Sequence, residues 1–158
     1  MILRKTLKKV NMMREIKFKA WDKIGKRIGE VNYIKYSDVQ YNQVSARFKQ
    51  NGKTVDEWFA YGDKDGCDNI ILMQYTGLKD KNGVEVYEGD ILKLFYGKEN
   101  TPLTTTKVYF NEEGYWDSKN LSEQHPFRAC YGGFSKCEVI GNIYENPELL
   151  EGEANASN

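Results

Sequence analysis

Short segments in which apolar and polar residues alternate run through most of the chain, and turn residues separate them. Residues 16–20 read Ile-Lys-Phe-Lys-Ala, which places the apolar side chains on one face of a strand. Asn51-Gly52 lies between two such segments and is a hairpin signal, because glycine accepts the positive φ of a tight turn. No long amphipathic helix can be read, and residues 55–61 are the one ambiguous stretch. The pattern predicts an all-β barrel or sandwich.

Strands are expected in short blocks, and one helical turn is expected near the carboxyl end. Pro147 at a first helical position, after the cap residue Asn146, predicts a turn of helix through Leu150. Asn82-Gly83 predicts a type I′ turn with positive φ at both residues. The expected strand blocks are residues 16–20, 30–36, 40–48, 54–61, 70–73, 75–78, 84–87, 91–96, 107–111, 115–116 and 137–144.

Size and composition place the chain among ordinary cytoplasmic domains. Its 158 residues correspond to one domain, and 40% hydrophobic content suffices for a core without metal or disulfide support. A membrane span needs about 18 consecutive apolar residues, and no such run or secretory signal region is present. Three cysteines, Cys67, Cys130 and Cys137, are an odd number without close spacing. They favour free thiols in a reducing cytoplasm.

The net charge of zero hides an asymmetry along the chain. Residues 1–36 hold eleven Lys or Arg against three acidic residues, whereas residues 37–158 hold twelve against twenty. A basic segment of this kind can bind nucleic acid, because neutralising phosphates releases counterions. It can equally lie against the acidic remainder of its own chain or be solvated. Both interpretations stay open.

Basic and aromatic residues interleave at residues 17–21 and 33–36, in a chain with 13% aromatic residues. Aromatic side chains on a barrel face stack with the bases of single-stranded nucleic acids. Strand-rich proteins also use Tyr and Trp as half-buried packing residues, which is the more common case.

Acidic residues offer the main candidates for catalysis or metal binding. Residues 63–68 resemble the start of a calcium loop but lack its closing glutamate. Asp80 is expected to stabilise its Asn-Gly turn, and Asp90 is expected to bond backbone amides where the chain bends. His125, the one histidine, lies in a polar, proline-broken segment without ligands at zinc spacing. No catalytic residue, cofactor or metal is therefore expected.

Three longer segments, taken together, are more specific than any of these groups. They are residues 13–22 (MREIKFKAWD), 72–91 (LMQYTGLKDKNGVEVYEGDI) and 138–150 (EVIGNIYENPELL). In this order and spacing they resemble the YopX family of small phage and prophage proteins. The resemblance spans residues 13–150, and the usual start of the family corresponds to Met13.

The resemblance implies a β-rich structure with an SH3-like barrel. We expect a flexible extension at residues 1–12, which folding does not require, a YopX-like domain at residues 13–150 and a disordered tail at residues 151–158. The domain is expected to consist of a β subdomain at 13–73 and a barrel at 74–145. No role is assigned to residues 99–136.

YopX-like proteins have no established activity, so the resemblance carries over no catalytic residue. We expect an accessory protein that binds a nucleic acid or a protein partner in the cytoplasm of a bacterial host, and self-association stays open. One alternative is a phage factor that binds and inhibits a host or defence protein; a carboxylate-dependent enzyme ranks last. The candidate binding residues, which either line one surface or cap turns, are Trp21, Asp22, Tyr75, Thr76, Asp80, Glu88, Asp90, Asn142 and Tyr144.

Overall fold

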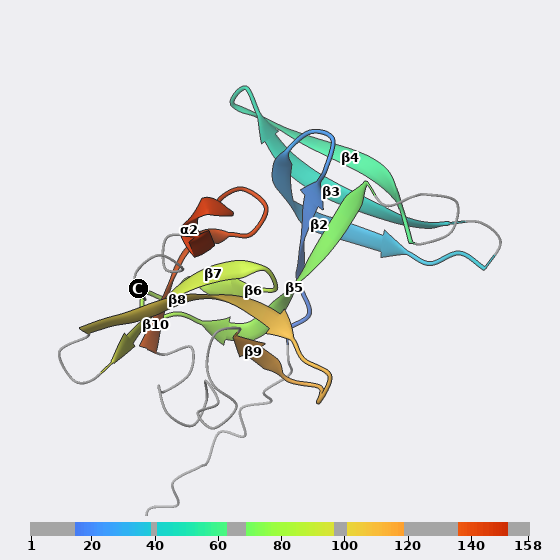
Figure 1. Cartoon of the computed structure of the whole chain (residues 1–158). Coiled ribbons are helices and arrows are strands. Elements are labelled where there is room, and N and C mark those ends of the chain that lie inside the picture. The colour runs from blue at the N-terminus through green and yellow to red at the C-terminus, as the bar shows by residue number, and fades with distance from the viewer. Residues whose placement is uncertain (1–14, 39–40, 63–68, 97–100, 119–135, 152–158) are drawn as a thin grey trace, which may run out of the picture.

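The computed structural model describes residues 15–38, 41–62, 69–96, 101–118 and 136–151, which form antiparallel strands and one short helix (Figure 1). The all-β prediction is confirmed. The strands of the first sheet, in the order β4-β3-β2-β1-β5-β6, are β1 (Phe18–Asp22), β2 (Arg27–Lys35), β3 (Asn42–Gln50), β4 (Lys53–Tyr61), β5 (Ile70–Lys79) and β6 (Glu85–Tyr87). Those of the second, in the order β10-β7-β8-β9, are β7 (Asp90–Tyr96), β8 (Thr101–Phe110), β9 (Trp116–Ser118) and β10 (Cys137–Asn142). The helix is α2 (Glu148–Glu151), close to the predicted turn.

The first sheet curls around a core on one of its faces. The buried cluster on that face consists of Ala20, Ala46, Phe48 and Ile70. Phe59 of β4 and Leu72 of β5 both pack against this cluster, although three strands separate β4 from β5 in the sheet. The ambiguous residues 55–61 are part of β4 and are not helical. The opposite face of β1–β4, which we call the convex face, points away from this core.

The second sheet has its own core, built mainly from the alternate residues of its strands. That cluster consists of Val86, Leu92, Leu94, Val108, Trp116 and Cys137. Burial raises the pKa of the Cys137 thiol to about 12, so it packs as a buried, neutral side chain. Neither sheet closes on itself in the described residues, and the SH3-like barrel stays a prediction.

One long strand, β5, spans the predicted boundary between the two subdomains. Residues 70–74 of β5 pair with β1, and the later part of the same strand pairs with β6. The predicted boundary between residues 73 and 74 therefore falls inside one strand. A third buried cluster, made of Met73, Tyr75 and Tyr87, lies at this position and contacts Ile28 and Tyr144. The division into two subdomains stays a prediction, and the two halves share both a strand and a core.

Of the two hairpin turns predicted from the sequence, one is confirmed and the other has a different type. Asn51 and Gly52 have φ values of 50° and 74°, as the hairpin prediction requires. The type I′ prediction at residues 82–83 is wrong, because φ is positive at Gly83 (82°) and not at Asn82. Gly83 N instead donates to Asp80 O at 3.1 Å, the bond of a type I turn followed by a left-handed residue.

Several predictions fall outside the described residues. These are the extension at 1–12, the loop at 63–68 with Cys67, residues 99–100 and 119–135, which include His125 and Cys130, and the tail beyond Glu151. Within the described residues, no helix combines the length and the apolar character that crossing a membrane requires.

Candidate functional site

Residues from all three YopX-like segments meet at the junction of the two sheets. The rings of Trp21 and Tyr144 stack with centroids 5.6 Å apart and planes inclined by 17°. Tyr75 and Tyr87 lie beside them as a second ring pair, with centroids 5.4 Å apart. Trp21 and Tyr75 are buried, so these residues hold the junction together and offer little surface to a ligand.

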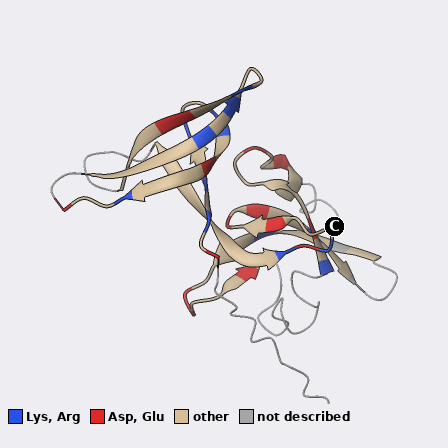
Figure 2. Cartoon of the chain, turned by 180° about the vertical axis from the view of Figure 1, so that it is seen from behind, with Lys and Arg blue, Asp and Glu red and all other residues tan. Residues whose placement is uncertain are grey.

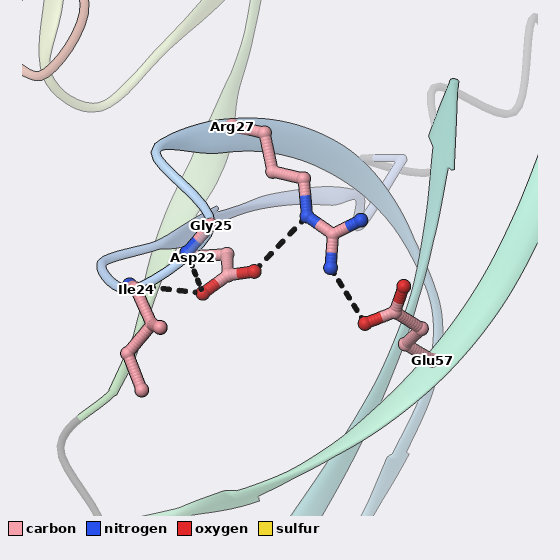
Figure 3. Close-up of polar contacts among 5 residues, drawn as sticks. All are labelled: Asp22, Ile24, Gly25, Arg27 and Glu57. Carbon is pink, nitrogen blue, oxygen red and sulfur yellow. Dashed lines mark hydrogen bonds and ion pairs between the residues drawn. The ribbon is translucent and has the colours of Figure 1, made fainter. Parts of the chain in front are cut away.

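Asp22 stabilises the turn between β1 and β2 (Figure 3). Its Oδ1 accepts hydrogen bonds from the backbone amides of Ile24 (3.1 Å) and Gly25 (2.9 Å). Its Oδ2 accepts a hydrogen bond from Nε of Arg27 at 3.0 Å, and Nη2 of Arg27 donates to Glu57 at 2.6 Å. Burial raises the pKa of Asp22, but the hydrogen bonds from Gly25 and Arg27 outweigh burial and hold the pKa below its ordinary value.

Asp80 connects a hairpin to β10, as well as supporting its own turn. Its Oδ1 accepts hydrogen bonds from Asn82 N (2.8 Å) and Val84 N (2.9 Å), which confirms the predicted role in the turn. Its Oδ2 accepts a hydrogen bond from Val139 N at 2.9 Å, across the chain. All of these donors are backbone amides, so the carboxylate is used by the fold.

Thr76 and Asn142 are similarly bonded to nearby backbone. Thr76 Oγ1 donates to Val86 O at 2.8 Å and accepts from Leu78 N at 3.2 Å. Asn142 Oδ1 accepts from Tyr144 N (3.0 Å) and Glu145 N (2.9 Å). This side-chain turn ends β10 at Asn142, two residues earlier than predicted.

Asp90 and Glu88 are the candidate acids with raised pKa values. Asp90 accepts a hydrogen bond from Tyr87 N at 2.7 Å, which confirms the predicted backbone contact. Burial raises the pKa of Asp90 to about 6 and raises the pKa of Glu88 above its ordinary value. Perturbed carboxyl groups can mark a catalytic site. In the described part of the chain, however, no group of three or more His, Cys, Asp or Glu residues is placed to hold a metal ion.

The convex face carries a second set of residues, which the sequence-based candidate list did not include. Strand register places Lys19, Glu30, Arg47 and Asp56 opposite one another on β1, β2, β3 and β4. Partners in register share a face of the sheet, so these side chains form a row of alternating charge. Figure 2 shows basic and acidic residues interspersed along the strands of this sheet.

A β-bulge brings an aromatic pair onto the same face. The register of β2 against β3 shifts between Val31 and Tyr33, so Tyr33 lies opposite Ser45. Ser45 in turn lies opposite Trp58 of β4. Tyr33 and Trp58 stack across the small serine with ring centroids 6.2 Å apart and planes inclined by 12°. The pair is open to solvent, since Tyr33 is 67% exposed and Trp58 57% exposed.

Two hollows lie on the convex face. The first has a volume of about 410 Å³ and is lined by five basic residues against two acidic ones. The second, of about 500 Å³, is lined by residues that include Tyr33, Lys17 and Glu85. Glu30 lines both hollows, so they are neighbours. The lining of the first, which we call the basic hollow, is Lys19, Lys26, Arg27, Ile28, Gly29, Glu30, Arg47, Lys49, Thr54 and Glu145.

The two arginines of the basic hollow already have carboxylate partners. Arg47 holds Asp56 through two hydrogen bonds, Nε to Oδ1 at 2.8 Å and Nη2 to Oδ2 at 3.0 Å. This contact lowers the pKa of Asp56. The guanidinium of Arg27 binds Asp22 and Glu57. The lysines of the hollow are not held in this way by any carboxylate in the described part of the chain. Lys19 Nζ lies 4.2 Å from the centre of the Tyr87 ring. Lys26 and Lys49 are exposed and form no ion pair with any described residue.

Comparison with known proteins supports the identification of the family. The sequence model for "YopX protein" matches residues 17–151, which is most of the chain. The chain belongs to the YopX family. A solved structure that resembles this YopX-family chain is the crystal structure of protein EF1440 from Enterococcus faecalis. The two are 29% identical with a TM-score of 0.58, and the match covers 87% of this chain and 99% of that one. No curated protein matches the chain.

The sequence signals for the convex face were the basic region 1–36, which contains Lys19 and Lys26, and the interleaved residues 17–21 and 33–36. Tyr33 belongs to the last of these stretches and is exposed, as a binding interpretation requires. No sequence pattern indicated a binding role for Trp58, because its exposure depends on the pairing of β3 with β4. The hollow and the aromatic pair therefore form the best candidate site of this YopX-family protein.

Proposed function

We propose that this YopX-family protein acts by binding and not by covalent chemistry, and that it binds a nucleic acid on its convex face. The observation that carries the proposal is the basic hollow, whose lining includes three lysines in addition to the two paired arginines. Lysine ammonium groups bind phosphate oxygens as point charges. The lysines that supply these charges are Lys19, Lys26 and Lys49.

The distribution of ion pairs supports this position for the ligand. Within the basic amino-terminal region, Lys17 is paired with Glu85 at 2.7 Å, and Arg27 is paired with Glu57. Part of the local charge excess is thus neutralised by the acidic remainder of the chain. Lys26 and Lys49 keep their charge available at the basic hollow. Three lysines predict weak binding with a modest salt dependence, since each phosphate contact contributes about 0.7–0.9 to the slope of log K against log salt.

The test compares two neighbouring lysines of the β3–β4 hairpin. Lys49 lies opposite Thr54 on the convex face, whereas Lys53 lies opposite Gln50 and shares the other face. Fluorescence anisotropy of labelled random oligonucleotides, measured at several salt concentrations, gives the affinity and the slope. We expect Lys49→Ala to weaken binding and to lower the slope by about 0.7–0.9. Lys53→Ala should change neither quantity. Equal effects of the two substitutions, or no binding at low salt, would contradict the proposal.

A protein partner is the second candidate, and the row of alternating charge favours it. Lys19, Glu30, Arg47 and Asp56 present both signs in a fixed order, which suits a complementary protein surface. Exposed Trp and Tyr beside an arginine are typical of residues that dominate protein interfaces. Inhibition of a host or defence protein would be one form of this activity. The measurement is capture of a discrete host protein from a nuclease-treated lysate by the wild type and its loss in both Arg47→Ala and Trp58→Ala.

A further inference from the structure

We infer that the nucleic acid is single-stranded and that its bases stack on Tyr33 and Trp58. The inference rests on the proposed function and names its substrate class. It starts from a separate observation, which is the exposed aromatic pair and not the charge of the basic hollow.

The aromatic pair has the properties of a stacking platform. The two rings are close to parallel and more than half of each side chain is open to solvent, so their outer faces are accessible. Every base offers an apolar π-face, and stacking on an aromatic side chain is tolerant of sequence. Sheet-borne aromatic residues that stack with bases are a common mode of single-strand recognition. The other two tryptophans, Trp21 and Trp116, are buried, so Trp58 is the exposed tryptophan of the chain.

The platform and the basic hollow are arranged in sequence along β3. Ser45, Arg47 and Lys49 point to the same face, and Ser45 lies between the two aromatic rings. Successive same-face residues are about 6.6 Å apart, so Lys49 lies about 13 Å along the strand from the platform. A nucleic-acid strand whose bases stack on Tyr33 and Trp58 can thus place one of its nearby phosphates close to Lys49.

The row of alternating charge lies beside the platform, and three of its four residues, Lys19, Glu30 and Arg47, also line the basic hollow. Glu30 and Asp56 flank Arg47 in this row, and Asp56 binds the arginine. The charge of Arg47 is thereby compensated, so phosphates are attracted mainly to the lysines of the basic hollow and the platform is left to uncharged base faces. A duplex keeps its bases in its own stack and must unpair to offer them. The geometry therefore favours a single strand over a duplex.

Tryptophan fluorescence provides a direct readout at this position. The chain has three tryptophans. Trp21 and Trp116 are 6% and 5% exposed and Trp58 is 57% exposed, so a stacked base quenches mainly Trp58. The experiment titrates the full chain with oligothymidylate and with a duplex of mixed sequence, at low salt. The variants are Trp58→Ala and Trp58→Phe, and the control is Phe110→Ala, which removes an exposed aromatic side chain from β8 of the other sheet.

We expect oligothymidylate to quench the wild-type fluorescence and to leave Trp58→Phe unquenched. Trp58→Ala should bind oligothymidylate roughly five-fold to a hundred-fold more weakly, the range measured for loss of one stacked base. Trp58→Phe should keep most of the affinity, and Phe110→Ala should keep all of it. Duplex binding should be weaker than single-strand binding and unaffected by Trp58→Ala.

The outcomes separate the inference from the proposed function. Binding that depends on Lys49 but shows no quenching, with no effect of Trp58→Ala, overturns the inference and leaves the proposed function standing. Equal affinity for duplex and single strand, or an equal loss of both in Trp58→Ala, also overturns it. If neither oligonucleotide binds at low salt, both proposals fail.

Discussion

Trp21 and Tyr144 stack at a centroid distance of 5.6 Å, although they come from opposite ends of the family-matched region. Trp21 belongs to β1, and Tyr144 follows β10. The segment that carries Tyr144 is also tied to the chain before β7, because Ile143 N donates to Gly89 O at 2.9 Å. The two sheets are thus held together by contacts among the three segments that characterise the family.

The first prediction compares a buried tryptophan with an exposed one. Trp21→Ala removes a large side chain from the junction and should lower the free energy of unfolding by about 3–5 kcal/mol. Trp58→Ala removes a ring that is mostly solvated and should cost less than about 1 kcal/mol. Urea unfolding of both variants measures the difference. Similar losses would mean that the junction does not depend on the Trp21–Tyr144 stack.

The second prediction concerns the turn at Gly83. Its φ of 82° lies in the left-handed region, where a β-branched residue is strongly disfavoured. Gly83→Val should therefore destabilise the fold by about 1–2 kcal/mol or more. Gly83→Asn should cost less, because asparagine tolerates this conformation.

Asn51→Ala provides a second comparison for the Gly83 variants. Asn51 also has positive φ (50°), but alanine carries no β-branch. Thermal unfolding should therefore rank Gly83→Val as more destabilising than both Gly83→Asn and Asn51→Ala. The opposite order would exclude a left-handed residue at position 83.

The third prediction uses the pH dependence of Asp90. Burial raises its pKa from 3.8 to about 6, so the folded state binds the proton more tightly than the unfolded state. The resulting stabilisation is fully present below pH 4 and is lost as the pH rises through about 6. Relative to Asp90→Asn, which has no proton to lose, wild-type stability should fall by up to about 3 kcal/mol across this range.

Chemical denaturation of wild type and Asp90→Asn from pH 4 to pH 7 measures this difference. The asparagine side chain can still accept the hydrogen bond from Tyr87 N, so the variant should fold. A difference in stability that stays constant over the range would show that Asp90 titrates normally.

The fourth prediction concerns divalent cations. Asp80 and Asp90 each bond backbone amides, and the described residues contain no cluster of His, Cys, Asp or Glu suited to a metal. A site that binds a metal ion only in the folded state would raise Tm by mass action. Millimolar Mg²⁺, Mn²⁺ or Ca²⁺ should accordingly leave Tm unchanged. A rise in Tm that disappears in Asp90→Asn would instead support a metal-dependent enzyme.

Local sequence predicted those features that neighbouring residues control. The positive φ values of Asn51 and Gly52 follow from the chemistry of a two-residue hairpin. Asp80 was expected in its turn and makes those bonds, since both of its turn donors lie within four residues. The prediction of the turn type at residues 82–83 failed, because the Asp80 carboxylate binds the amides of this turn and holds the backbone in a different conformation.

The amino-acid sequence by itself determined the all-β class, most strand positions and the family, because alternation and turn residues act over short distances. Only the tertiary structure decided which aromatic residues are exposed. Trp21 and Trp58 lie on the same face of the first sheet, yet Trp21 is buried at the junction, where it stacks with Tyr144, and Trp58 is open to solvent. Tyr33 reaches Trp58 because a bulge after Val31 shifts the register of β2. A shift of one residue turns every later side chain to the other face, and it depends on pairing with a distant strand.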